Sequence, residues 1–140
     1  MPTNGLHPGD VIRYPYRWAR ESLSDRAPDG TKDRPCGVIV VAKAASGRTH
    51  ILLLAISSQA PRSDQAALSL PPIERRRAGL DANREAWIYV SEANEDVEGQ
   101  SFYLTDEPQT GAISRVFLER VKAAFLARLQ RKMGSVVRRM

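Results

Sequence analysis

Short apolar runs alternate with polar stretches that contain glycine or proline through the first hundred residues of the chain. The runs are rich in valine, isoleucine and aromatic residues, which fit a pleated and packed surface, so they indicate β-strands. Glycine and proline between the runs mark turns and loops. The predicted strands cover residues 11–16, 36–42, 49–56, 67–70, 86–90 and 101–104.

Two neighbouring runs predict the centre of a sheet. Residues 36–42 and 49–56 are apolar along most of their length, and a short turn at residues 45–48 separates them. This arrangement predicts an antiparallel hairpin with both arms buried. Residues 18–32 are polar and read as a long loop, a kind of segment that often carries function.

The remaining pattern predicts helices. Residues 73–78 suit one or two helical turns, with Gly79 as their stop. Residues 115–133 suit a longer helix, and Ser114 is placed to cap its first turn. Apolar positions recur along one face of this helix at Phe117, Val121, Ala124, Phe125 and Leu129.

Five or six short strands and one C-terminal helix predict a mainly β fold, in the form of a small, strongly bent β-barrel. A parallel sheet would need crossover helices between the strands, and the pattern contains none. The length of 140 residues suits one compact core, so we expect a single domain over residues 1–140.

Composition narrows the possible compartments and chemistries. No apolar run approaches the roughly 20 residues that span a bilayer, and residues 1–6 lack the features of a secretory signal. A single cysteine, Cys36, cannot form an internal disulfide, so we expect a cytoplasmic protein. With only His7 and His50 beside that cysteine, no zinc-ligand spacing is present, and we expect neither a metal nor a cofactor.

The charge balance permits a nucleic-acid partner. The chain has 21 Lys and Arg against 16 Asp and Glu, a formal net charge of +5. Most of the basic residues are arginine, whose planar guanidinium matches two phosphate oxygens at once. The alternative is that these arginines form ordinary solvated surface.

Two polar residues stand where the predicted hairpin would bring them together. Arg34 precedes the first arm and Ser57 follows the second, so both fall at the same end of the sheet. An arginine and a hydroxyl suit phosphodiester cleavage, because RNA supplies its own 2′-hydroxyl as the nucleophile. Neither a GxSxG elbow nor a glycine-rich phosphate loop offers other chemistry. Taken singly, each residue has a plainer explanation, a solvated arginine and a turn serine.

Four short motifs carry a resemblance to a known family, and in chain order they read HPGDVIRY, KDRPCGVIVV, HILLLAISSQ and TGAISRVFLERVKAAFL. Together they resemble the MazF/PemK family of toxin endoribonucleases. The matches are Gly-Asp-hydrophobic at residues 9–12, Arg-Pro at residues 34–35, a strand ending in a hydroxyl residue at residues 56–57, and a Gly-to-helix step at residues 111–127.

The resemblance implies a small SH3-like barrel, a homodimer, a cognate antitoxin and metal-independent cleavage of single-stranded RNA. By motif position, Arg34 takes the catalytic arginine role and Ser57 the role usually held by threonine. Serine keeps the hydroxyl but lacks the methyl group that restricts its rotamer. Further RNA contacts are expected from Ser58, Gln59, Arg17 and Arg20.

The general base does not carry over, because residues 18–32 depart from the shorter loop of the family. Its candidates are Glu21, Asp33 and His7. Two alternatives stay open at this stage. One is a barrel of the same family that binds nucleic acid or an antitoxin without cutting, and the other is a protein-interaction barrel whose arginines are solvated.

Overall fold

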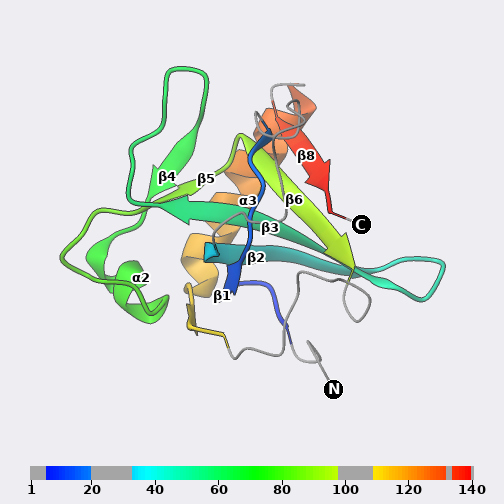
Figure 1. Ribbon diagram of the computed structural model, residues 1–140, viewed down its shortest axis with the longest axis horizontal. Coiled ribbons are helices and arrows are strands. Elements are labelled where there is room, and N and C mark those ends of the chain that lie inside the picture. The colour runs from blue at the N-terminus through cyan, green and yellow to red at the C-terminus, as the bar shows by residue number, and fades with distance from the viewer. Residues whose placement is uncertain (1–5, 20–32, 98–108, 132–133, 140) are drawn as a thin grey trace.

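The computed structural model describes residues 6–19, 33–97, 109–131 and 134–139. Short strands dominate these residues, and one long helix follows them (Figure 1). In chain order the elements are β1 (Asp10–Tyr14), β2 (Arg34–Lys43), β3 (Thr49–Ser57), β4 (Ala67–Ser69), α2 (Pro72–Arg77), β5 (Trp87–Tyr89), β6 (Glu92–Val97), β7 (Gly111–Ala112), α3 (Arg115–Gln130) and β8 (Ser135–Arg138).

The strands form one sheet around β3. Along its main path the order is β4-β5-β3-β2-β1-β7, and β6 pairs with the first half of β3 while β5 pairs with its last two residues. All pairings are antiparallel except that of β6 with β8. The path is open within the described residues, because β4 and β7 at its ends do not pair with each other. The fold is therefore mainly β with a C-terminal helix.

Both faces of the sheet are buried, and different parts of the chain cover them. Helix α3 packs on one face, where Phe117, Val121 and Phe125 join a cluster with Ile39 and Leu54. The second cluster lies on the other face and is covered by residues 15–19, the described segment that follows β1, as Figure 1 shows. Its aromatic members are Tyr14, Tyr16, Trp18 and Tyr89. Burial on both faces explains why β2 and β3 read as almost continuous apolar runs.

The first five predicted strands are confirmed, with small shifts at their ends. Strand β1 ends at Tyr14, directly before Pro15, which has no N–H to donate to a ladder. Strand β2 begins two residues earlier than expected, because Arg34 pairs with Tyr14. The predicted strand at residues 101–104 lies outside the described residues.

The helices also follow the prediction. Helix α2 covers Pro72–Arg77, and Gly79 follows it with a φ of 80°, the left-handed conformation that glycine adopts without strain. Helix α3 runs over Arg115–Gln130, three residues short of the predicted end. Ser114 caps α3 as expected, since its Oγ accepts a hydrogen bond of 3.2 Å from the Phe117 N–H.

Strand β6 was not predicted, and three of its buried side chains are polar. Glu92, Asn94 and Asp96 are at most 6% exposed. Asp96 accepts a hydrogen bond of 2.6 Å from the Tyr14 hydroxyl, and Asn94 bonds to the backbone of Arg17. These polar groups are buried because each has a partner, either at the end of β1 or on the segment that follows it.

Buried tyrosines should make the fold sensitive to alkali. Burial raises the pKa of Tyr14, with a further contribution from its bond to Asp96, and burial beside Glu92 raises the pKa of Tyr16. A pKa that is higher in the folded than in the unfolded chain leaves stability intact below about pH 10 and lowers it above that pH. Each tyrosine then removes about 1.4 kcal/mol of unfolding free energy per pH unit.

Burial also raises the pKa of the Cys36 thiol from its ordinary value of 9.0. We therefore expect urea denaturation to give a constant free energy of unfolding up to about pH 8.5 and a steep fall above about pH 10. Tyr16→Phe removes one of these three groups, so its curve should fall about two-thirds as steeply. An unchanged slope in this variant would show that tyrosine ionisation is not the cause.

In the described ranges, neither helix combines the length and the apolar composition that crossing a bilayer requires.

Candidate functional site

A pocket of about 290 Å³ opens where β2 begins and β3 ends. Arg34 and Pro35 line it from β2, and Ile56 and Ser57 line it from β3. The sheet register brings them together, because Cys36 pairs with Ala55 and the two strands run antiparallel. Arg34, two residues before Cys36, and Ser57, two residues after Ala55, therefore share one end of the sheet.

The guanidinium group of Arg34 lies against an aromatic ring. Its guanidinium carbon lies 5.4 Å from the centroid of the Trp18 ring, within the range of a cation–π contact. Its Nε is buried and has no hydrogen-bond partner, and no carboxylate of the described residues forms a salt bridge with it. The charge of Arg34 is thus desolvated on one side, and no salt bridge with a described residue neutralises it.

Ser57 sits in a tight turn at the end of β3. Its Oγ accepts a hydrogen bond of 3.1 Å from the Gln59 N–H, and Gln59 in turn accepts one of 2.5 Å at its carbonyl from the Tyr89 hydroxyl. The first contact is the ordinary role of a turn serine. It also fixes the oxygen while leaving the hydroxyl proton available to a group in the pocket.

The opposite wall of the pocket comes from the segment between α2 and β5. Leu80, Asp81, Arg84, Glu85 and Ala86 contribute to it. Arg75 holds this wall in place, because its Nη1 donates a hydrogen bond to the Arg84 carbonyl and its own carbonyl accepts one from the Leu80 N–H. The pocket thus contains a second cation, Arg84, and two carboxylates.

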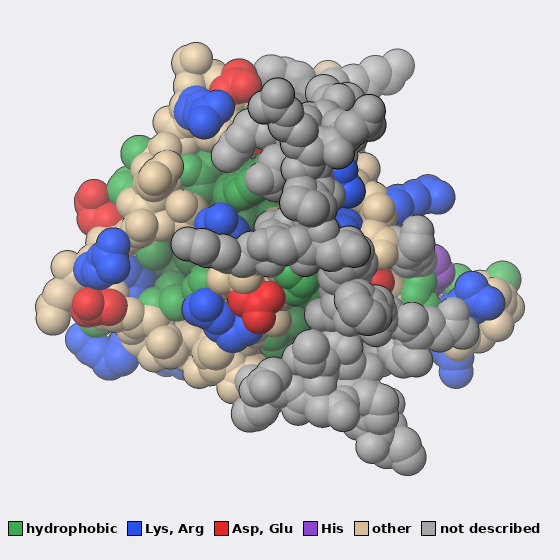
Figure 2. Space-filling model, in the orientation of Figure 1, with side chains coloured by type: hydrophobic (Ala, Val, Ile, Leu, Met, Phe, Trp, Pro, Cys, Tyr) green, Lys and Arg blue, Asp and Glu red, His purple; other side chains and the backbone are tan. Residues whose placement is uncertain are grey.

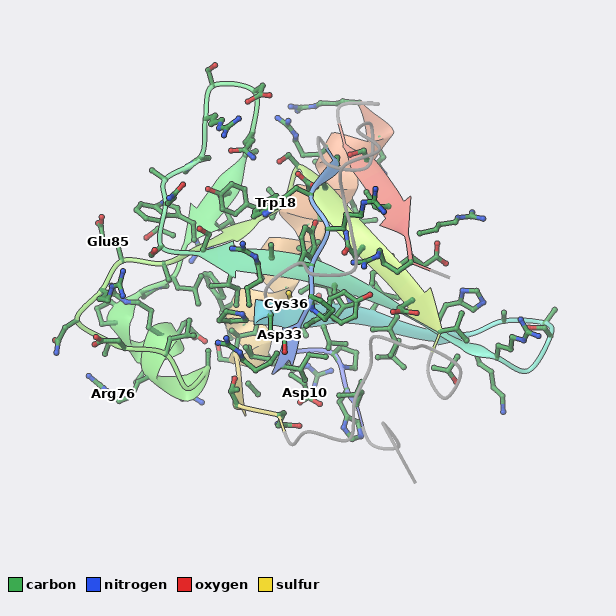
Figure 3. All side chains as sticks on the ribbon, in the orientation of Figure 1. Asp10, Trp18, Asp33, Cys36, Arg76 and Glu85 are labelled. Atoms are coloured by element: carbon green, nitrogen blue, oxygen red, sulfur yellow. The ribbon has the colours of Figure 1, made fainter. Side chains whose placement is uncertain are left out.

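The sequence did not predict this wall. It depends on the pairing of Ser57 with Trp87, which places the residues before Trp87 beside the end of β3 and which no short stretch of sequence specifies. Arg75, Arg76 and Arg77 lie side by side in helix α2. They divide as helix geometry requires, with Arg75 half-buried and Arg76 and Arg77 exposed. Figure 3 shows Arg76 and Glu85 at the α2 end of the molecule.

The structure separates most of the other predicted residues from this pocket. His7 lies beside Asp10, whose Oδ2 accepts a hydrogen bond of 2.8 Å from the His7 N–H, at the far end of β1 from Tyr14. Asp33 is exposed and its carbonyl accepts from Arg13. Arg17 is half-buried and does not line the pocket.

Of the expected RNA contacts, Ser58 lines the pocket and Gln59 follows it in the same turn. Arg20 and Glu21 lie outside the described residues. Cys36 lies two residues beyond Arg34, and burial raises the pKa of its thiol, so it packs as a small apolar residue.

Charge around the site is mixed. On the visible part of the face in Figure 2, Lys and Arg side chains lie among Asp and Glu side chains. Within the described ranges, no cluster of three or more His, Cys, Asp or Glu side chains is arranged to hold a metal ion. The chemistry that this pocket offers is therefore that of two guanidinium groups, a fixed hydroxyl and two carboxylates.

A comparison of the chain with protein-family models and with curated protein sequences gives no match.

Proposed function

We propose that this protein is a toxin endoribonuclease (an mRNA interferase of a type II toxin-antitoxin system) that cuts single-stranded RNA without a metal. The observation that carries the proposal is the convergence of Arg34 and Ser57 on one pocket from the ends of two paired strands. The resemblance of the four sequence motifs to the MazF/PemK family also supports it, and two of these motifs contain Arg34 and Ser57.

The proposed reaction is an internal displacement at phosphorus. The 2′-oxygen of the substrate attacks the adjacent phosphorus, the bond to the 5′-oxygen breaks, and the products carry a 2′,3′-cyclic phosphate and a 5′-hydroxyl. Arg34 stabilises the charge that develops on the phosphorane, and the Ser57 hydroxyl donates to a phosphate oxygen. A base takes the proton of the 2′-hydroxyl, and the leaving 5′-oxygen gains a proton.

The pocket carboxylates join the candidates for the base. Asp81 and Glu85 line the same pocket as Arg34, whereas Asp33 and His7 do not. Asp81 already accepts a hydrogen bond of 2.9 Å from the Asn83 N–H. Glu85 is therefore the carboxylate that we favour among those of the pocket.

The proposal extends to the fold and the partners that the resemblance implies. It includes closure of the sheet into an SH3-like barrel, a homodimer, a cognate antitoxin that competes with RNA, and a cytoplasmic location.

A second function stays in competition with the first, a barrel of the same type that binds RNA or an antitoxin without cutting. The contact between Ser57 and the Gln59 N–H favours this alternative, because it gives the serine a structural role that needs no substrate.

Cleavage of a long single-stranded RNA in EDTA separates the two functions. We expect the protein to cut this RNA, to leave 2′,3′-cyclic phosphate ends, and to spare DNA of the same sequence, which has no 2′-hydroxyl. Arg48→Ala is the matched control, because Arg48 is an exposed arginine in the turn at the other end of the β2–β3 hairpin. Tight RNA binding without cleavage would establish the alternative.

Arg84 should contribute to RNA affinity through phosphate. With RNA methylated at its 2′-oxygens to prevent cleavage, we expect affinity to fall as salt rises. Arg84→Ala should bind more weakly and lower the slope of log affinity against log salt by about 0.7, the loss of one single-strand phosphate contact. Arg76→Ala, on the exposed face of α2, should change neither quantity. Equal slopes for wild type and Arg84→Ala would remove Arg84 from the RNA path.

A further inference from the structure

The ring of Trp18 lies against the guanidinium group of Arg34. The guanidinium carbon of Arg34 lies 5.4 Å from the Trp18 ring centroid, and Trp18 itself is only 6% exposed. A carboxylate in this place would neutralise the arginine and compete for its N–H donors. An aromatic face attracts the cation and leaves those donors available to a phosphate.

The ring of Trp18 is held by two other aromatic rings. Its centroid lies 5.2 Å from that of Tyr16 and 5.1 Å from that of Tyr89, with interplanar angles of 68° and 82°. Edge-to-face contacts of this kind are the favoured arrangement of aromatic pairs. In Figure 3, Trp18 lies over the sheet, and all three rings belong to the buried cluster on that face.

The backbone of Trp18 is fixed on both sides by strand β6. Asn94 donates to the Arg17 carbonyl and accepts from the Arg17 N–H, both at 2.8 Å. Glu92 accepts a hydrogen bond of 2.6 Å from the Ala19 N–H. The Arg17 carbonyl and the Ala19 N–H belong to the two peptide groups that flank Trp18, so neither group can rotate without losing one of these hydrogen bonds.

The same aromatic cluster reaches Ser57. Tyr89, whose ring contacts Trp18, donates its hydroxyl proton to the Gln59 carbonyl, and the Gln59 N–H holds the Ser57 Oγ. One buried cluster therefore connects the guanidinium and the hydroxyl that line the pocket. The positions of Arg34 and Ser57 therefore depend on the same set of packed and hydrogen-bonded groups.

We propose that Trp18 is a positioning residue for Arg34, which orients the guanidinium toward the scissile phosphate by a cation–π contact and is itself oriented by Asn94 and Glu92. This inference rests on the proposed function. It adds a residue that neither the sequence motifs nor the pocket lining identifies. A catalytic cation is effective only when its position is set before charge develops, and the ring supplies that preorganisation.

The test compares Trp18→Phe, which keeps an aromatic face, with Trp18→Leu, which keeps only apolar volume. We expect Trp18→Phe to retain most of the wild-type kcat and Trp18→Leu to lose about 10-fold in kcat with a smaller change in KM. Trp87→Phe is the control, because Trp87 is the other tryptophan and packs against the same cluster without a cation–π contact to Arg34.

A measurement on the folded protein makes the test independent of activity. In a nitrogen-15 spectrum, the Hε signal of Arg34 should be shifted upfield by the ring current of Trp18 and should lose this shift in Trp18→Leu. Arg34→Lys identifies the signal by its disappearance. An unshifted signal in the wild-type protein would overturn the contact, even if Trp18→Leu failed to fold.

The outcomes distinguish this inference from the proposed function. Full activity of Arg34→Ala would refute the function itself, whatever Trp18 does. Loss of activity in Arg34→Ala, together with wild-type kcat in a folded Trp18→Leu, would leave the function standing and reject the positioning role. Equal losses in Trp18→Phe and Trp18→Leu would also reject it, because packing alone would then explain both.

Discussion

Arg34→Ala is expected to cut RNA at least about 100-fold more slowly than the wild type while keeping its fold. Removing one fixed donor that stabilises a developing oxyanion costs about 3 kcal/mol in the transition state. The fold should survive, because Arg34 is a half-buried residue at a strand end with no salt bridge to a described residue. It lines the pocket and packs against the edge of the core only through Trp18.

Three further variants sharpen this result. Arg34→Lys should also lose activity, because an ammonium group cannot replace a planar guanidinium that bonds two oxygens. Ser57→Ala should be impaired, whereas Ser57→Thr keeps the hydroxyl and should remain active. Initial rates of RNA cleavage measure the effect, with circular dichroism to confirm folding and Arg48→Ala as the control. A folded Arg34→Ala that cuts at the wild-type rate would mean that Arg34 is an ordinary surface residue.

Asn94→Ala is expected to destabilise the protein by about 3 kcal/mol. Asn94 is fully buried, and its side chain pairs with both the N–H and the carbonyl of Arg17. Its Oδ1 also accepts a hydrogen bond of 3.2 Å from Arg139, beyond the end of β8. Alanine would leave two backbone groups of Arg17 short of a partner, and each such group costs about 1–3 kcal/mol when buried.

Urea denaturation at pH 7 measures this loss, and Asn83→Ala is the matched control. Asn83 is exposed in the turn before β5, so its substitution should change stability by no more than about 0.5 kcal/mol. Asn94→Asp should also be unstable, because a carboxylate cannot donate to the Arg17 carbonyl. A loss below about 1 kcal/mol in Asn94→Ala would show that water replaces the asparagine.

The elements that the sequence predicted best are those with a regular apolar pattern. β2 and β3 were predicted because β-branched residues fill them, and a strand buried on both faces needs apolar side chains at successive positions. Helix α3 was predicted from its apolar face and from Ser114, whose side chain caps the first turn. The cap joins Ser114 to Phe117, only three residues away, so a short stretch of sequence is enough to predict it.

The sequence did not reveal strand β6, because Glu92–Val97 is rich in acidic and amide side chains that strands usually lack. These side chains are buried only because the Tyr14 hydroxyl in β1 and the backbone of the segment after β1 offer them partners. Strands β7 and β8 were not predicted either. Gly111–Ala112 is too short for a pattern, and its place beside α2 depends on a glycine whose added Cβ would collide with the Arg77 carbonyl.

By itself the sequence determined the strands with continuous apolar runs, helices α2 and α3, and the pairing that puts Arg34 and Ser57 at one end of the sheet. Each of these depends on local propensity or on the register of a single hairpin, which a short stretch of residues specifies. The tertiary structure alone decided that Arg84 and Glu85 complete the pocket. It also decided that Arg34 makes a cation–π contact with Trp18, and that β6 forms hydrogen bonds to the backbone on both sides of Trp18. The physical reason is that these contacts join residues far apart in the chain, and a polar side chain shows no sign in sequence of which distant group will satisfy it.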